Sequence, residues 1–365
     1  MNMCQAYAYH GHKVRLIVPN RKTTDGRKYS VQDLFTFYGI TVPFEIKRIW
    51  LPRIRSSWIY FCFIIPFLAW IFRPKFVHTR SIGVAWGCSK FFKLNTLFEL
   101  HNDPFKDPII ASYLQQLFQQ PLCKGIVVIT ESLRRHILNK ISTKKQILVL
   151  ADGVSFHKLN QNITKEEARK RTGLPLNQKI ALYAGSLYEG RGIEVVIMLA
   201  TRFTDYNFYI VGGNSDQISL FKSKAGQFSA NLHFCGFIDP ALVHNYLLAS
   251  DILLMPYAPV VKVVGGAETS AFASPIKLFE YMATGRPILS STLPVLNEII
   301  VDKQDALMIP YEQHESWAKA FSFLDENPAE AQRISENARK KVEQFTWERR
   351  AAQICAFIQN GKDLL

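Results

Sequence analysis

Apolar and polar positions along the chain form short segments that alternate between the strand pattern and the helix pattern. Apolar runs of strand length occupy residues 12–20, 76–80, 96–100, 125–130, 146–154, 179–186, 207–213, 231–237, 251–257 and 286–291. Apolar positions at helical spacing occur in residues 131–140, 192–203, 240–250, 274–284 and 314–324. Strands that alternate with helices predict parallel sheets with crossover helices, and therefore an α/β fold.

This alternation is interrupted once, by a polar and charged stretch at residues 156–179. Such a stretch predicts a boundary between two domains, joined near residue 155. Ligands of parallel sheets bind at the carboxyl ends of the strands, where glycine-containing turns meet helix starts. Two such domains in tandem therefore predict a ligand-binding cleft between them.

The segment SPIKLFEYMATGRPILSS is the most informative local pattern in the chain. Ser274 suits a helix N-cap, and Pro275 suits the first helical position, where its missing N–H group has no cost. Ile276, Phe279 and Ala283 recur at helical spacing and are expected to contact the core. The pattern predicts a short helix that begins at the edge of the cleft.

The same helix carries one carboxylate, Glu280, and ends at Gly285, which can adopt the left-handed conformation. Helical side chains lean toward the N-terminus, so the Glu280 carboxylate points toward the helix start. That start favours an anion such as phosphate, and a carboxylate beside it can bind ribose hydroxyls. An ordinary solvent-facing glutamate is the alternative interpretation.

Two further turns in the second half suit an anion, at residues 184–194 and 210–216. Arg191 lies in the first of these turns, and its guanidinium can bind a phosphate with two hydrogen bonds. Lys277, in the first turn of the helix that follows Ser274, adds a second cation. A solvated loop charge is the alternative for Arg191.

Charge is distributed unequally over a chain of 365 residues with a net charge of +14. Residues 1–150 contain 22 Lys and Arg against 7 Asp and Glu, whereas residues 151–365 contain 22 against 23. The first half is therefore strongly basic and the second nearly neutral, which points to a polyanionic surface, either a membrane or a nucleic acid.

The segment at residues 47–75 favours the membrane. Residues 56–72 carry no charge, and they are bracketed by Arg53, Arg55, Arg73 and Lys75. Seventeen residues is the lower limit for a membrane span, and a proline interrupts them. A helix or helical hairpin in the headgroup region is the favoured interpretation. A buried helix of the first domain and a membrane span are the alternatives.

The six cysteines are scattered and contain no Cys-x-x-Cys pair. Neither a zinc site nor a disulfide framework is indicated, and a reducing compartment fits this usage best.

Taken together, these segments resemble the family 4 retaining glycosyltransferases of the GT-B fold. The similarity covers nearly the whole chain, and SPIKLFEYMATGRPILSS is its most specific match, while YAGSLYEGRGIEVVI resembles the donor-phosphate loop. The resemblance implies two Rossmann-like domains, doubly wound around parallel sheets, that face a central cleft. It implies an acceptor-binding domain at residues 1–155, a donor-binding domain at residues 156–345, and a C-terminal helix at residues 346–365 that returns to the first domain.

The implied activity is transfer of a hexosyl group, with retention of configuration, from a nucleoside diphosphate sugar to a membrane-associated glycan or glycolipid of the cell surface. By resemblance, His101, Arg191 and Glu280 are catalytic: Glu280 binds the ribose, Arg191 the diphosphate, and His101 lies near the transferred sugar. The residues expected to bind the donor are Gly185, Ser186, Arg191, Gly212, Phe237, Ile238, Ser274, Pro275, Ile276, Lys277 and Glu280. No cofactor or obligate metal is expected, and the chain contains no Asp-x-Asp motif.

The sequence departs from the family pattern at three places. Phe272 occupies the position of a second glutamate, and the nearest acid, Glu268, is out of register. In the donor loop, Ser186 replaces an arginine and Arg191 replaces a lysine. The family normally opens with a strand and a Gly-rich loop of roughly 20 residues before the helix that begins this chain, so a truncated N-terminus is expected.

Other functions remain open on the sequence alone. A nucleotide-sugar epimerase of the same fold would release nucleotide without an acceptor, and an inactive truncated module would retain only donor binding. Nucleic-acid binding is disfavoured, because the basic residues surround an apolar run and form no aromatic stacking platform. The expected location is cytoplasmic, on the inner face of the membrane, with residues 47–75 on the anionic surface.

Overall fold

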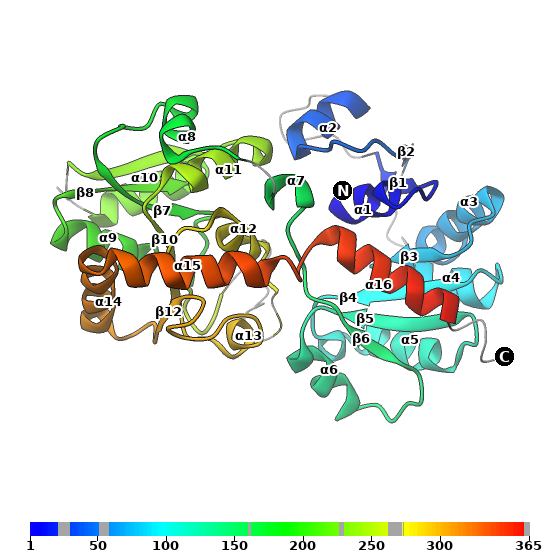
Figure 1. The fold of residues 1–365 in the computed structure, drawn as a ribbon. Helices are drawn as coiled ribbons and strands as arrows, with labels where there is room; N and C mark the ends of the chain where they lie inside the picture. The colour runs from blue at the N-terminus through cyan, green and yellow to red at the C-terminus, as the bar shows by residue number, and fades with distance from the viewer. Residues whose placement is uncertain are drawn as a thin grey trace.

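A computed structural model of the chain describes residues 1–20, 30–50, 58–159, 162–225, 230–261, 272 and 274–360. The described residues form two α/β domains that lie side by side, with both ends of the chain on the first domain (Figure 1). Within the described ranges, the named strands of both domains pair in parallel. The predicted α/β class with two parallel-sheet domains is confirmed.

The first domain contains two separate sheets. After α1 (Asn2–Tyr9), the strands β1 (Arg15–Pro19) and β2 (Glu45–Ile49) pair with each other, and α2 (Val31–Tyr38) connects them. The second sheet has the order β3-β4-β5-β6. Its strands are β3 (Val77–Thr79), β4 (Thr96–Leu100), β5 (Cys123–Val128) and β6 (Ile147–Val149). Its helices are η1 (Tyr60–Ile64), α3 (Ile65–Phe72), α4 (Ile82–Lys90), η2 (Pro104–Lys106), α5 (Pro108–Gln119) and α6 (Glu131–Leu138).

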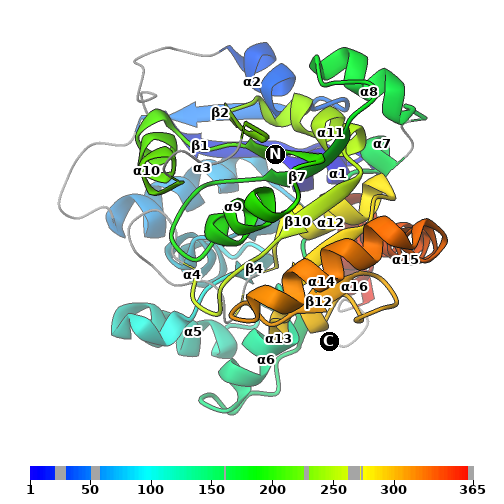
Figure 2. The same ribbon diagram turned by 90° about the vertical axis from the view of Figure 1, so that its left-hand side faces the viewer.

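The second domain has one sheet with the order β12-β11-β10-β7-β8-β9. Its strands are β7 (Lys179–Ala184), β8 (Tyr206–Val211), β9 (Leu232–Gly236), β10 (Ile252–Met255), β11 (Ile288–Ser291) and β12 (Leu307–Ile309). Its helices are α7 (Phe156–Leu159), α8 (Lys165–Thr172), α9 (Ile193–Arg202), α10 (Ser215–Ala225), α11 (Pro240–Ala249), α12 (Ile276–Thr284), α13 (Pro294–Asn297), α14 (His314–Glu326) and α15 (Pro328–Val342). Figure 2 views this domain from its outer side, with α9 and α14 on one face of the sheet and α8 and α11 on the other.

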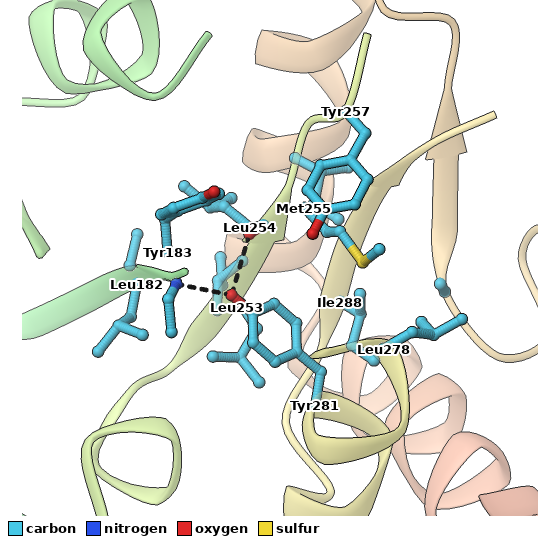
Figure 3. Close-up of a cluster of buried hydrophobic side chains, with 14 of the residues drawn as sticks. Leu182, Tyr183, Leu253, Leu254, Met255, Tyr257, Leu278, Tyr281 and Ile288 are labelled. Carbon is cyan, nitrogen blue, oxygen red and sulfur yellow. Dashed lines mark hydrogen bonds between the residues drawn. The ribbon is translucent and has the colours of Figure 1, made fainter. Parts of the chain in front are cut away.

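The order of this sheet reverses between β7 and β10, which are its central strands. They pair only through Ala181 with Ile252 and Leu182 with Leu253. Beyond that point the hydroxyl of Tyr281 joins them, because it accepts a hydrogen bond from the Ala184 N–H at 2.8 Å and donates to a β10 carbonyl at 3.3 Å (Figure 3). The strands therefore separate at their carboxyl ends, where a topological switch point favours a ligand site.

Helix α12 differs from its predicted form at its first turn. It begins at Ile276 with Pro275 as the N-cap residue, and no side chain caps it. The Ser274 hydroxyl does not cap the helix, because it accepts a hydrogen bond from the Asp152 N–H at 2.9 Å. Ile276 is 40% exposed, so it does not contact the core as predicted. The end of the helix agrees with the prediction: Gly285 is left-handed, with φ of 63°.

The polar stretch at residues 156–179 contains a helix that its apolar pattern did not predict. Helix α8 is capped by Thr164, whose hydroxyl accepts the Glu167 N–H. Ion pairs four residues apart, Lys170 with Glu166 and Arg171 with Glu167, support it. One arginine of this helix is buried and bonds to Asp251 and two carbonyls. Polar contacts therefore stabilise this helix. The spacing of apolar residues does not predict a helix of this kind.

The C-terminal helix α16 (Trp347–Asn360) leaves the second domain and packs on the first, as Figure 1 shows. Its apolar side contacts α1 and the first-domain sheet. The shared core contains Ala6, Tyr7, Leu97, Val127, Trp347, Ala351, Ile354 and Ile358. The two domains are thus connected at residue 155 and again at residue 346, and α16 completes the core of the first.

The apolar segment after residue 57 forms η1 and α3, which continue directly into each other. The buried side of these two helices includes Cys62, Pro66 and Ala69. The opposite side exposes Ile59, Phe63, Phe67, Trp70 and Ile71. Arg53 and Arg55 lie outside the described residues. None of the helices in the described ranges has both the length and the apolar character that a bilayer span requires.

Replacing Ile354 with alanine tests the role of α16. Ile354 is fully buried in the core that α16 shares with the first domain. The Ile354→Ala variant should lower the free energy of unfolding by about 2–5 kcal/mol, measured by urea denaturation. Gln353→Ala, one position earlier on the exposed side, should stay within about 0.5 kcal/mol of the unmodified chain. Equal effects of the two substitutions would contradict this packing.

Candidate functional site

The carboxyl ends of strands from both domains meet around one cavity of about 330 Å³. It lies where β7 and β10 separate, and the turn after β6 closes it from the first domain. Its lining consists of Asp152, Gly185, Ser186, Arg191, Tyr257, Val261, Ser274, Pro275, Ile276, Lys277, Leu293, Val295 and Leu296. Seven of the residues that the sequence selected for donor binding are therefore brought together in one place.

Two cations share this cavity without anionic partners among the described residues. The Lys277 Nζ atom and the Arg191 Nε atom are buried, and neither has a hydrogen-bond acceptor. Lys277 Nζ lies 3.7 Å from the centre of the Tyr183 ring, and the guanidinium of Arg191 lies 4.6 Å from that of Tyr257. Figure 3 places both tyrosines at the end of the buried cluster beside β7 and β10. Aromatic faces attract cations but supply no acceptor, so both donors remain available to an anion.

Burial is the main reason that the pKa of Lys277 is well below its usual value. The charge of Arg191 lowers this pKa further, while Glu280 opposes the shift. A buried cation beside a second cation is unfavourable in the empty site, and a bound anion would relieve both effects. Strongly perturbed groups in a cleft are typical of functional sites.

Two glycines allow the loops to approach this cavity so closely. Gly185, directly after β7, has φ of 146°, and a Cβ atom there would lie 2.6 Å from Lys277 Nζ. Gly212, after β8, has φ of 123°, and its Cβ would lie 2.1 Å from the carbonyl oxygen of Gly185. Side chains at these positions would collide with the cation site or with the neighbouring loop.

The start of α12 adds uncharged donors to the same cavity. The first N–H groups of a helix have no partner within it, and those of α12 belong to residues that line the cavity. The Ser274 hydroxyl accepts the Asp152 N–H, so its own hydrogen is available to a ligand. Arg191, Lys277 and this helix start together can hold a group with two negative charges.

Glu280 does not line this cavity, and its partner is a residue that the sequence analysis did not select. Its carboxylate is paired with the ammonium of Lys158, in the short helix α7 that connects the domains. Both side chains are 23% exposed. The carboxylate therefore lies within reach of solvent and of the linker, and a ribose would compete with Lys158 or bind beside it.

His101 belongs to a chain of buried polar groups in the first domain. Glu99 accepts from the His101 Nε2 atom at 2.5 Å and from the His78 Nε2 atom at 2.9 Å. Tyr7 contacts the other nitrogen of His78 at 2.9 Å. Arg350 of α16 forms an ion pair with Glu99 at 3.0 Å. His101 is thus oriented by Glu99, with only its Nδ1 atom left for a ligand.

The carboxylate of Glu99 stays ionised although it is buried. Burial by itself would raise its pKa, but hydrogen bonds from His101 and His78 and the charge of Arg350 lower it below the usual range. The sequence signal for this group is a charged residue inside a strand whose five residues are all buried. A single charge in such a strand requires partners, and only the fold identifies them.

Phe237 and Ile238, which were predicted to bind the donor, lie in the turn after β9, next to the turn after β8. Gly212 donates its N–H to Gly236 at 2.7 Å, which joins the turns after β8 and β9. Phe237 is 65% exposed, and its ring lies 6.2 Å from that of Phe37 in the first domain, nearly parallel to it. Ile238 packs on the core of the second domain. None of Gly212, Phe237 and Ile238 lines the cavity that contains the two cations.

Other contacts hold the domains together on the first-domain side. The Glu298 carboxylate accepts the N–H groups of Glu131 and Ser132 at the start of α6, at 2.8 and 2.9 Å. Phe272, in the place of the family's second glutamate, packs on His136. Glu268 lies outside the described residues. Among the residues that are described, no group of three or more His, Cys, Asp or Glu is arranged to hold a metal ion.

Comparison with known proteins was made by family model and by sequence. Residues 164–341 match the model of the family Glycosyl transferases group 1. The D-inositol 3-phosphate glycosyltransferase of Xylanimonas cellulosilytica is 21% identical over 194 residues, 50% of this chain and 43% of that protein. The D-rhamnosyltransferase WbpZ of Pseudomonas aeruginosa is 26% identical over 171 residues, 47% of this chain and 42% of that protein. The match spans less than half the length of both relatives.

Solved structures resemble the chain over nearly its whole length. Sucrose-phosphate synthase from Thermosynechococcus elongatus superposes with a TM-score of 0.75 at 16% identity, over 100% of this chain and 92% of that one. Anabaena Alr3699/HepE, solved in complex with UDP and glucose, gives 0.72 at 12% identity, over 98% and 94%. Residues 164–341 therefore match the Glycosyl transferases group 1 family, and the chain as a whole has the GT-B fold.

Proposed function

We propose that the chain is a glycosyltransferase that takes its sugar from a nucleoside diphosphate sugar. The observation that carries this proposal is that Arg191 and Lys277 line one cavity, where the Arg191 Nε and Lys277 Nζ atoms are buried and have no hydrogen-bond acceptor among the described residues. Their charge, and the open N-terminus of α12 beside them, match a diphosphate. The group 1 family match over the domain that contains both cations supports the same assignment.

The reaction breaks the bond between the anomeric carbon and the diphosphate oxygen, and it forms a bond from the same carbon to an acceptor oxygen. The acceptor's proton passes to the leaving diphosphate oxygen, so atoms and charge balance without a protein nucleophile. Negative charge grows on the diphosphate as the sugar leaves, and preorganised cations and N–H groups stabilise it. We propose that the new bond forms on the same face, with retention of configuration.

Four other residues complete the proposed donor site. Glu280 binds the ribose, with Lys158 as its partner when the site is empty. Phe237 and Ile238, in the turn after β9, contact the nucleotide base in this proposal. His101, fixed by Glu99, orients the sugar or shares charge with the departing phosphate. No metal is required in this scheme, because the two cations and the helix start supply the positive charge.

The acceptor is proposed to be a membrane-associated glycan or glycolipid of the cell surface. The relative WbpZ is a D-rhamnosyltransferase, and a structural neighbour, WaaG, is a glycosyltransferase involved in lipopolysaccharide biosynthesis, with a TM-score of 0.66. Turnover that depends on an added acceptor would distinguish a transferase from an epimerase or from a module that only binds the donor.

The apolar side of η1 and α3 supports the membrane part of this proposal. Its five large exposed side chains lie on one face, and the exposed cations Arg73, Lys75, Lys90 and Lys93 follow the C-terminal ends of α3 and α4. An apolar face bordered by cations is typical of a helix that lies in the headgroup region. We propose that this face binds the inner, anionic surface of a membrane, with the chain in the cytoplasm.

Replacing Lys277 with methionine separates binding from stability. Lys277→Met should weaken nucleoside diphosphate binding at least about tenfold. It should also raise the free energy of unfolding of the empty chain by about 1–2 kcal/mol, because an unpaired buried charge is removed. Thermal unfolding with and without UDP, GDP and ADP measures both effects.

The matched control is a lysine that has acceptors. Lys145 Nζ donates to two backbone carbonyls, of Gln120 and Cys123, each at 2.5 Å. Lys145→Met should therefore destabilise the chain and leave nucleotide affinity unchanged. A Lys277→Met variant that behaves like Lys145→Met would contradict a ligand-binding role for Lys277.

Nucleotide binding should be coupled to proton uptake. The empty site has a lowered Lys277 pKa, and a bound anion raises it, so the protonated form binds better. Affinity should fall as the pH rises between the lowered pKa of the empty site and the higher pKa of the occupied site. Calorimetry between about pH 7 and 9, where the terminal phosphate is already ionised, in two buffers of different ionisation enthalpy measures the uptake. Lys277→Met should abolish the proton uptake. An affinity of the unmodified chain that does not change with pH would contradict this coupling.

The membrane face can be tested with vesicles. Replacing Phe67 and Trp70, which are 46% and 47% exposed, with serine should reduce sedimentation with phosphatidylglycerol vesicles severalfold. Added salt should weaken binding of the unmodified chain, since cations contribute to it. Phe323→Ser, on an exposed helix of the second domain, is the control and should have no effect. Unchanged sedimentation of the double variant would exclude this face as the contact.

A further inference from the structure

One buried carboxylate in the cleft is not used by the proposed reaction. Asp152 follows β6 at the junction of the two domains, and it is one of the residues that line the cavity containing Arg191 and Lys277. Only 6% of the residue is exposed. Its backbone N–H donates to Ser274, but its carboxylate has no hydrogen-bond partner among the described residues. The Asp152 oxygens are not among the side-chain atoms that are both fully buried and without a partner, so they remain accessible in the cleft and open to a ligand.

The charged groups around Asp152 leave its carboxylate without a hydrogen bond. Burial raises the pKa of Asp152, and the charge of Glu99 raises it further, whereas the charges of His101, Arg350 and Arg80 oppose that shift. Arg350 is already engaged, since it pairs with Glu99 and donates to the Leu150 carbonyl at 3.1 Å. These groups surround the carboxylate from the first domain at longer range, and none of them donates a hydrogen bond to it.

The position of Asp152 determines what kind of ligand group it can bind. A carboxylate accepts hydrogen bonds and repels anions, so it does not bind the diphosphate itself. The phosphate-binding groups all come from the second domain, whereas Asp152 faces the cavity from the junction and is close enough to feel the charge of His101. The part of the donor that lies between the diphosphate and His101 is the sugar, whose hydroxyls are hydrogen-bond donors.

We propose that Asp152 accepts hydrogen bonds from the hydroxyl groups of the sugar that the nucleotide carries, and that it thereby selects and positions this sugar. The inference rests on the proposed function, because it assumes that the diphosphate occupies the two cations. It also explains the contact with Ser274. The Asp152 N–H holds the serine hydroxyl, which can donate to the phosphate, while the Asp152 carboxylate holds the adjoining sugar. One residue would then fix both sides of the bond that breaks.

The proposal predicts that Asp152 affects the affinity for a sugar nucleotide but not the affinity for the corresponding nucleoside diphosphate. A hydrogen bond to a charged group should make the sugar nucleotide bind at least about tenfold more tightly than it would without Asp152. The nucleoside diphosphate alone does not reach this residue, so its affinity should not depend on Asp152.

The test measures both dissociation constants by titration calorimetry on the full chain. The ligands are UDP with UDP-glucose and GDP with GDP-mannose, and the variants are Asp152→Asn and Asp152→Ala. Both variants should weaken binding of the sugar nucleotide at least about tenfold and change binding of the nucleoside diphosphate less than about threefold. Equal weakening of both ligands, or no weakening of either, would overturn the inference.

The control is a second buried carboxylate at the same junction. Glu348 is 4% exposed, accepts the Phe156 N–H at 3.2 Å and does not line the cavity. Glu348→Gln should lower the unfolding midpoint of the empty chain without altering the ratio of the two affinities. Asp152→Asn should leave the midpoint unchanged or raise it, and a loss of stability like that of Glu348→Gln would mark Asp152 as structural. If the unmodified chain bound no nucleotide, the proposed function would fail, and the role of Asp152 with it.

Discussion

The arrangement of the cleft depends on two neighbouring cations, Arg191 and Lys277, whose Nε and Nζ atoms are buried without a hydrogen-bond acceptor among the described residues. The two side chains lie on the rings of Tyr257 and Tyr183, whose faces attract cations. Removing such groups from water is unfavourable unless a partner arrives. Such an arrangement is typical of a site whose partner is a ligand, because binding of an anion stabilises the folded protein.

The backbone around this corner is arranged to keep the two cations close together. β7 and β10 separate after two paired residues, and the Tyr281 hydroxyl joins them where their own hydrogen bonds end. The space between the strand ends is where the cations lie. Gly185 and Gly212 bring the loops after β7 and β8 against it, in conformations that a side chain would not allow. The unfavourable charge pair is thus supported by a rigid sheet, as a precise site requires.

Of two buried carboxylates that the described part of the first domain brings near the cleft, Glu99 has hydrogen-bond donors and Asp152 has none. Glu99 holds His101 and His78 and is paired with Arg350 of the helix that returns from the second domain. This network fixes His101 before any ligand binds. Asp152, at the junction, differs, because its carboxylate lacks a donor in the empty cleft. The cleft therefore presents unsatisfied cations on one side and an unsatisfied carboxylate on the other, which matches a molecule with an anionic end and a hydroxyl-bearing end.

The sequence by itself determined the α/β class, the strand–helix alternation, and the loops that carry Arg191, Lys277 and Gly185, because periodicity and turn chemistry are local properties of a few neighbouring residues. It did not predict α8, whose support is polar, and it misplaced the first turn of α12, because the Ser274 hydroxyl is used by Asp152, 122 residues away in sequence. Only the tertiary structure decided the partners: Lys158 for Glu280, Arg350 for Glu99, and Phe37 for Phe237. These pairs join residues that are far apart in the chain. Contacts between single distant side chains produce no repeating pattern in the sequence, so the sequence does not predict them.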